Sequence, residues 1–348
     1  MKLSIGIVGL PNVGKSTLFK ALTKKQVDAE NYPFCTIDPN IGTVEVPDER
    51  LGQLAKVYNS EKVIPTVIEF VDIAGLVAGA HKGEGLGNKF LSHIREVDVI
   101  CQVVRNFHDD DVIHVAGEVN PDSDKQTINM ELIFADLATL EKVIKETEPK
   151  TKTGDKEEMK RLDVFQKSKN ALDQETLLFD VAFTDDEKVI INELNLLTIK
   201  PFLYVLNVDE GTKIEDRDNY LNISAKLEAE LANMPANEVQ EYLSTLGYEK
   251  TGLDRLIISA YGLLNLISFF TSGPKETRAW ACEEGSTAPQ AGSKIHSDFE
   301  EKFIRAEVAN WKDIIEYGGE VGAKAKGKVK IEGKEYIVKD GDVIYFRI

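Results

Sequence analysis

Apolar and polar positions alternate between strand-like and helical stretches over the first hundred residues. Short apolar runs at 3–8, 67–71 and 97–104 are typical of buried parallel strands, and a helical run follows the first of them at 16–22. This rhythm predicts an α/β domain in which crossover helices cover a parallel sheet.

A helical seam replaces this rhythm from about Asn129. Its apolar residues recur at spacings of four, three and four: Ile133, Leu137, Leu140 and Ile144. Three further apolar residues suggest a returning helix: Leu162, Phe165 and Leu172. The charged stretch 147–160 between them predicts a solvated tip, so we expect an antiparallel helical hairpin at 129–185. It is either a charged surface pair or a partner-binding arm.

A strand-like run returns at 200–206, which makes the hairpin an insertion into the α/β domain. That domain is therefore expected to comprise 1–128 and 186–264. From 265 to 348, Gly, Thr and Ser become frequent and the last residues alternate around turn signals. This pattern predicts a small β-rich domain with tight turns.

Composition is that of an ordinary globular chain. The 348 residues are 42% hydrophobic and 29% charged, and the longest apolar runs are too short to span a membrane. Cys35, Cys101 and Cys282 lack the spacing of a zinc site or disulfide framework, so a reducing cytoplasm is the simplest setting. The net charge of -17 disfavours general adhesion to nucleic acid or membrane.

Any RNA contact must therefore be local, and the C-terminal end offers one. Residues 324–348 hold seven Lys or Arg against four Asp or Glu. Four lysines alternate there: Lys324, Lys326, Lys328 and Lys330. On a strand they would point to one side and could face RNA. The alternative is an edge strand that its lysines protect from aggregation.

The clearest motif reads Gly-Leu-Pro-Asn-Val-Gly-Lys-Ser at Gly9–Ser16, between an apolar strand and a helical run. This context is the one that a phosphate-binding loop requires. Lys15 would place its charge on the β- and γ-phosphates, and Ser16 would offer an oxygen to Mg²⁺. The expected phosphate contacts are the backbone N–H groups of Asn12, Val13, Gly14, Lys15, Ser16 and Thr17.

Two later segments could complete such a site. Thr36 could bring its hydroxyl to the magnesium ion from a loop. Asp72 ends the strand 67–71 and begins Asp-Ile-Ala-Gly, in which the Asp would hold the metal shell and the Gly75 N–H would meet the γ-phosphate. Each signal alone is weak, but their order after the phosphate loop is specific.

The expected base-binding segment follows the strand at 202–206. It reads Asn207-Val208-Asp209-Glu210, whereas a guanine site of this class carries Asn-Lys-x-Asp. Val208 and Glu210 therefore alter the packing platform and the carboxylate that would read guanine, which opens the site to ATP. Ser224 lies where the class usually completes its base pocket.

The group that positions water is not obvious from the motifs. Leu76 stands where a glutamine usually follows Asp-x-x-Gly, and leucine can neither donate nor accept a hydrogen bond. His114, after an apolar strand, is the best candidate, and His81 in a Gly-rich stretch is the second. A lone histidine is more often structural.

These departures together resemble the YchF or Obg-like ATPase family, over essentially the whole chain. The matching segments are Gly9–Ser16, Asp72-Ile-Ala-Gly-Leu-Val, Lys82-Gly-Glu-Gly-Leu-Gly-Asn-Lys-Phe-Leu, Asn120-Pro, Asn207-x-x-Glu, Arg278-Ala-Trp and Asp340-Gly-Asp-Val-Ile-Tyr-Phe. The resemblance implies a C-terminal TGS domain of β-grasp fold and Mg²⁺-dependent ATP hydrolysis with weaker use of GTP. It also implies ribosome association, with the large subunit as the expected contact, a catalytic histidine at His114, and backbone recognition of adenine at Val208.

Three functions stay open at this point. The first is an ATPase switch that responds to or alters the state of the ribosome. The second is a binding adaptor in which nucleotide only orders loops, and the third is a conventional GTPase. Cys35, beside Thr36, raises the smaller possibility that oxidation blocks the metal-side loop.

Overall fold

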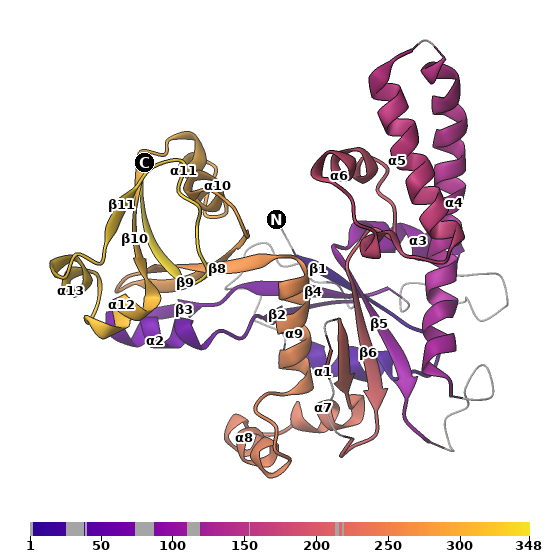
Figure 1. Cartoon of the computed structure of the whole chain (residues 1–348). Helices are drawn as coiled ribbons and strands as arrows, with labels where there is room; N and C mark the ends of the chain where they lie inside the picture. Colours follow the sequence, from indigo (N-terminus) through magenta and orange to yellow (C-terminus); the bar gives the residue numbers. More distant parts are fainter. Residues whose placement is uncertain are drawn as a thin grey trace.

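The computed structural model in Figure 1 contains two mixed sheets and a long helical arm. The described residues are 3–25, 38, 40–73, 87–109, 119–152, 154–212, 216–217 and 219–348. In those ranges no helix is long and apolar enough to cross a membrane.

The first sheet is the predicted α/β sheet, with strand order β2-β4-β1-β5-β6-β7. Its strands are β1 (Ser4–Val8), β2 (Ile41–Glu45), β4 (Val67–Asp72), β5 (Val99–Asn106), β6 (Phe202–Val208) and β7 (Tyr220–Ile223). All neighbours pair in parallel except β2, which runs antiparallel to β4. Because parallel strands end at the same edge, the C-terminal ends of β1, β4, β5 and β6 face one site.

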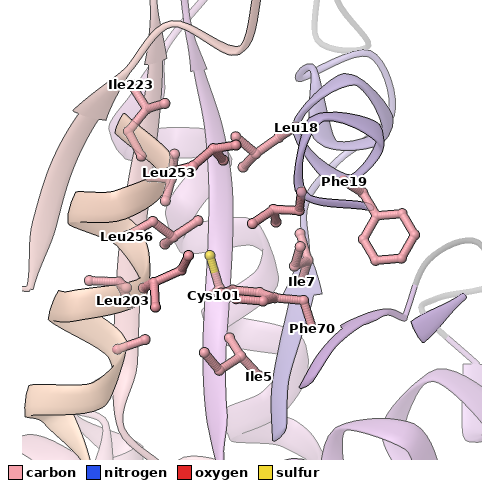
Figure 2. Close-up of a cluster of buried hydrophobic side chains, with 14 of the residues drawn as sticks. Ile5, Ile7, Leu18, Phe19, Phe70, Cys101, Leu203, Ile223, Leu253 and Leu256 are labelled. Atoms are coloured by element: carbon pink, nitrogen blue, oxygen red, sulfur yellow. The ribbon is translucent and has the colours of Figure 1, made fainter. Parts of the chain in front are cut away.

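Helices cover both faces of this sheet. On one face lie α1 (Lys15–Lys24), α7 (Ala225–Leu231) and α9 (Gly252–Leu263), and α8 (Ala236–Thr245) packs against α7. Figure 2 shows α1 and α9 meeting the strands through a buried apolar cluster. On the other face lie α3 (Gly87–Glu96) and the base of the arm, which share a second buried cluster.

The arm is the inserted helical hairpin that the apolar seam predicted. It contains α4 (Pro121–Thr151) and α5 (Lys156–Asp173), followed by the 3-10 turn Leu178–Asp180 and α6 (Asp185–Asn192). The first helix begins at Pro121, earlier than the seam at Asn129, because Asn120 caps it through a 3.1 Å bond from the Ser123 N–H. The helices also extend into the expected tip, which leaves only 152–155 between them.

A buried carboxylate anchors this arm to the sheet. Asp136, fully buried on α4, accepts bonds from the Leu197 N–H at 2.9 Å and the Thr198 N–H at 2.8 Å. The Thr198 hydroxyl donates a third bond at 2.7 Å. Burial raises the pKa of Asp136, and these three donors oppose that rise. The arm therefore has a fixed base just before β6.

The second sheet has strand order β11-β10-β12-β8-β9-β3, and β3 (Lys62–Ile64) comes from the first part of the chain. Its C-terminal strands are β8 (Leu266–Ser272), β9 (Glu276–Glu283), β10 (Arg305–Asn310), β11 (Lys330–Glu332) and β12 (Asp342–Arg347). Short helices lie between them: α10 (Ala288–Ser293), α11 (Asp298–Glu301), α12 (Trp311–Glu316) and α13 (Glu320–Ala325). This is the small β-rich unit expected from residue 265 onward.

The alternation of the C-terminal lysines was a wrong guide to their structure. Lys324 lies in α13, Lys326 ends that helix, and only Lys330 belongs to β11. The helix forms because Ala323 is buried beneath it, and Gly327, at φ 69°, follows its C-cap. The four lysines therefore do not line one face of a strand.

The second sheet also includes a segment from the first part of the chain. Between β2 and β4 the chain forms α2 (Glu49–Tyr58) and β3 (Lys62–Ile64), and β3 pairs in parallel with β9. Leu51 and Leu54 of α2 share a buried cluster with Phe270 and Val343. The segment α2–β3 therefore joins the two sheets, because it packs in the second sheet while β2 and β4, on either side of it in the chain, belong to the first.

Candidate nucleotide-binding site

The motif Gly9–Ser16 forms the connection from β1 to α1, as predicted. Gly14 has φ 91° and accepts a 3.0 Å bond from the Leu18 N–H, so it starts the helix in a left-handed conformation. A Cβ at Gly14 would collide with the Asn207 amide, and one at Gly9 would lie 2.7 Å from the Val103 carbonyl oxygen. Both glycines are therefore needed for close packing at this helix N-terminus, which is the kind of position where anions bind.

Lys15 and Asp72 come together although 57 residues separate them. The Lys15 ammonium forms an ion pair with the Asp72 carboxylate, and the two residues are 9% and 7% exposed. Asp72 is held in place because its N–H donates to the Asn40 carbonyl at 2.8 Å. Each residue of this buried pair neutralises the charge of the other. An incoming phosphate could therefore replace Asp72 as the partner of Lys15, and an incoming cation could replace Lys15 as the partner of Asp72.

The oxygen donors of this region suit a hard divalent cation. Ser16 is exposed at the start of α1. The Asp72 carboxylate, at the end of β4, lies beside Lys15, the residue that precedes Ser16 in α1. Within the described ranges, no group of three or more His, Cys, Asp or Glu side chains is arranged to hold a metal by itself. A cation here would need oxygens from a bound phosphate, as is common for Mg²⁺.

Asn207 at the end of β6 connects three elements. Its side-chain nitrogen donates to the Val13 carbonyl at 2.9 Å, and its oxygen accepts from the Ala225 N–H at 2.9 Å. The residue is 6% exposed. The structure thus makes Asn207 a brace between the phosphate loop, β6 and α7, and a direct contact with a base stays a prediction.

The other residues predicted to contact the base lie at the same sheet edge. Val208 is buried at the end of β6, and Ser224 caps α7 by accepting a 3.4 Å bond from the Leu227 N–H. Both line one cleft. The Glu210 carboxylate lies 3.2 Å from the Lys226 ammonium, so this substitute for the usual aspartate is engaged by a lysine.

Several predicted residues lie outside the described residues. They are the metal-side Thr36, the γ-phosphate contact Gly75, Leu76, the histidines His81 and His114, and Cys35. The other two cysteines, Cys101 and Cys282, are buried and free.

Two buried charged residues near the site were missed by the sequence interpretation. Arg105 is 2% exposed at the end of β5 and donates to the carbonyls of Phe107 at 3.3 Å and Asp109 at 3.1 Å. Glu228, 3% exposed on α7, accepts from the first two backbone N–H groups of α9 at 2.7 and 3.1 Å. A charge within an otherwise apolar strand was the available signal for Arg105.

Comparison with known proteins adds family information. Residues 4–131 match the family model described as 50S ribosome-binding GTPase. Residues 266–348 match the model YchF-GTPase_C, described as a protein of unknown function.

Similarity to individual proteins extends over the whole chain. It is 49% identical to the ribosome-binding ATPase YchF of Bacillus subtilis strain 168, over 100% of this chain and 99% of that protein. The ribosome-binding ATPase YchF of Escherichia coli O157:H7 is 48% identical, with 99% of each chain covered. The solved Schizosaccharomyces pombe YchF GTPase superposes with a TM-score of 0.91 at 36% identity, covering 99% of this chain and 98% of that one.

Proposed function

Because the chain belongs to the YchF family, we propose that it is a cytoplasmic, ribosome-binding ATPase that requires Mg²⁺ and uses GTP less well than ATP. The observation that carries the nucleotide part is the contact of Lys15 with Asp72 beside a phosphate loop braced by Asn207. This arrangement places a cation, a carboxylate and backbone N–H groups around one helix N-terminus.

Each residue of the site has a distinct proposed role. The backbone from Asn12 to Thr17 binds the phosphates, and Lys15 leaves Asp72 to neutralise the β- and γ-phosphates. Ser16, Asp72 and Thr36 hold the magnesium ion, which when bound stabilises phosphate charge. The further proposed roles are γ-phosphate contact by the Gly75 N–H, water positioning by His114, and base contact by Asn207, Val208 and Ser224.

Preference for ATP follows from the altered base segment. A guanine site needs a free carboxylate for two base N–H groups, whereas Glu210 is 3.2 Å from Lys226. The buried Val208 leaves its backbone as the means of reading adenine. A site without the guanine-specific carboxylate loses most of the discrimination against ATP.

Ribosome contact is proposed for the large subunit, with a local RNA contact in the C-terminal unit. Arg305, Lys324 and Arg347 surround the buried Glu307, with side chains 51%, 62% and 53% exposed. Such a cluster can meet phosphates although the whole chain is acidic. The arm, which Figure 1 shows projecting from the first sheet, offers a second surface and favours the adaptor function as the rival hypothesis.

Calorimetry tests the nucleotide assignment. We expect Mg²⁺-dependent binding that is tighter for ATP than for GTP, and ATP turnover that a Lys15→Ala variant loses. Equal or tighter binding of GTP would refute the ATP preference. Turnover by the wild type no faster than by Lys15→Ala, with ribosomes present, would refute the enzyme assignment.

Cosedimentation with separated ribosomal subunits tests the partner. Pelleting with the large subunit is expected, and it should weaken as salt rises if RNA phosphates contribute. Normal pelleting by a Ser16→Ala variant that lacks turnover would favour the adaptor over the ATPase switch.

A further inference from the structure

Arg105 holds a turn at the end of β5. Its Nε donates to the Phe107 carbonyl at 3.3 Å and its Nη2 to the Asp109 carbonyl at 3.1 Å. The guanidinium carbon lies 4.5 Å from the centroid of the Phe107 ring. Residues 107–109 therefore fold back over a side chain that is only 2% exposed.

The chemistry of this contact requires an arginine. A planar guanidinium presents several N–H donors in fixed directions, so one side chain can bond two carbonyls and also stack on a ring. A lysine ammonium is a single point charge on a flexible stem and cannot reproduce that arrangement. Burial of the cation is costly, which indicates that the position of the turn matters.

This turn lies beside the proposed base segment. Arg105 and Asn207 are partners in the parallel register of β5 and β6, so their side chains lie on the same face. On that face Asn207 contacts the phosphate loop through the Val13 carbonyl. Beyond the strands, the His108 N–H donates to the Asp209 carboxylate at 3.3 Å.

We propose that Arg105 is a positioning residue for nucleobase selectivity. Arg105 fixes the turn 107–109. Through the bond from the His108 N–H, this turn holds Asp209 and the adjacent base-reading residue Val208 in position. The phosphates are bound by backbone groups of another loop, so loss of Arg105 should impair discrimination between bases more than binding of the triphosphate. The inference rests on the proposed base site at Val208.

The test measures dissociation constants of ATP and GTP, with Mg²⁺, by calorimetry on the full chain. Arg105→Met should bring the ratio of the two constants about 5- to 10-fold closer to one, which corresponds to about 1 to 1.4 kcal/mol. Arg105→Lys should restore little of the lost ratio, because it keeps the charge and lacks the fork.

A matched control separates this role from general stability. Arg161 on α5 likewise combines a polar partner with a ring, because it pairs with the Glu193 carboxylate at 2.7 Å and lies 5.7 Å from the centroid of the Phe165 ring, but it belongs to the arm. Arg161→Met should leave the ATP to GTP ratio unchanged. If Arg105→Met lowers both affinities equally, its role is structural and the proposal is wrong.

Asp209 provides a second route if the Arg105 variants do not fold, because its side chain is 53% exposed. Asp209→Ala removes the acceptor for the His108 N–H and should also bring the ratio of the ATP and GTP dissociation constants closer to one, whereas Asp209→Asn keeps an oxygen acceptor and should leave the ratio unchanged. The double variant Arg105→Met/Asp209→Ala should change the ratio no more than the larger single effect.

Three outcomes would overturn the inference: an unchanged ratio in folded Arg105→Met, an unchanged ratio in Asp209→Ala, or additive effects in the double variant. A wild-type preference for GTP would instead refute the proposed ATP preference. In that case the variants still test Arg105, because loss of selectivity should bring the ratio of the two dissociation constants closer to one whichever nucleotide the wild type prefers.

Discussion

Replacement of Arg50 by methionine should weaken the joint between the two sheets. Arg50 lies on α2, and its guanidinium bonds the Asp48 carboxylate through Nε and Nη2, each at 2.8 Å. Across the joint it bonds Asp340 at 2.5 and 3.2 Å. Methionine keeps the stem of the side chain near Phe270 but removes all of these donors.

The structure indicates which of the two carboxylates dominates the cost. The Asp48 side chain is 10% exposed, so without Arg50 it remains as a largely buried charge, at a cost of about 2 to 3 kcal/mol. The Asp340 side chain is 51% exposed, and its ion pair contributes less than about 1 kcal/mol. Hydrogen bonding to Asp48 is also the main reason that the pKa of Arg50 is raised.

Intrinsic fluorescence gives a selective assay. The chain has two tryptophans, Trp280 and Trp311, and both belong to the C-terminal unit. Urea denaturation followed by tryptophan emission therefore reports on that unit, while circular dichroism reports on the whole chain. Arg50→Met should lower the urea concentration at the midpoint of the fluorescence transition. If the C-terminal unit unfolds separately, this midpoint should lie at a lower urea concentration than the midpoint of the circular dichroism signal.

Asp340→Asn is the matched control, because it keeps an Oδ1 acceptor for the Ser268 N–H, which lies 3.0 Å away. It should cost less than Arg50→Met. An equal or larger loss for Asp340→Asn, or a loss below about 1 kcal/mol for Arg50→Met, would refute the reasoning that the buried Asp48 carboxylate sets the magnitude.

Three other predictions concern separate contacts. Asn207→Ala removes the bonds to Val13 and Ala225 together with the proposed base contact, so it should weaken the binding of both ATP and GTP by about 10-fold or more in calorimetry; an unchanged affinity for either nucleotide would contradict the bracing of the phosphate loop. The pKa of Glu307 is lowered, first by its bond from Arg347 and then by that from Lys324, so the stability it contributes is present above its ordinary pKa of 4.5 and is lost as pH falls through the lowered value. Wild type should therefore exceed Glu307→Gln by about 1 to 2 kcal/mol in urea denaturation near pH 7, and the difference should shrink below about pH 4; a constant difference would contradict this. Asp136→Ala leaves the Leu197 and Thr198 N–H groups without their acceptor and should lower the free energy of unfolding by about 2 to 4 kcal/mol. Hydrogen exchange should rise at the base of α4, whereas an equal rise along the whole arm would argue against a local anchor.

Features that depend on neighbouring residues in the chain were predictable. The phosphate loop Gly9–Ser16 follows from a local motif, the buried strands from short continuous apolar runs, and the seam of α4 from the 3.6-residue repeat of a helix. The start of α4 was misplaced because its cap at Asn120 precedes the apolar seam.

Contacts between distant segments were decided only by the tertiary structure. Asn207 meets Val13 across 194 residues, and Arg50 meets Asp340 across 290. The role proposed for Arg105 depends on its register against Asn207, and β3 pairs with a strand more than 200 residues away. The C-terminal lysines show that local spacing alone can mislead. Their alternation predicted a strand, whereas the first of them lies in the helix α13, which packs through the buried Ala323. Periodicity records which side of an element is apolar, whereas its partner is selected by packing over the whole chain.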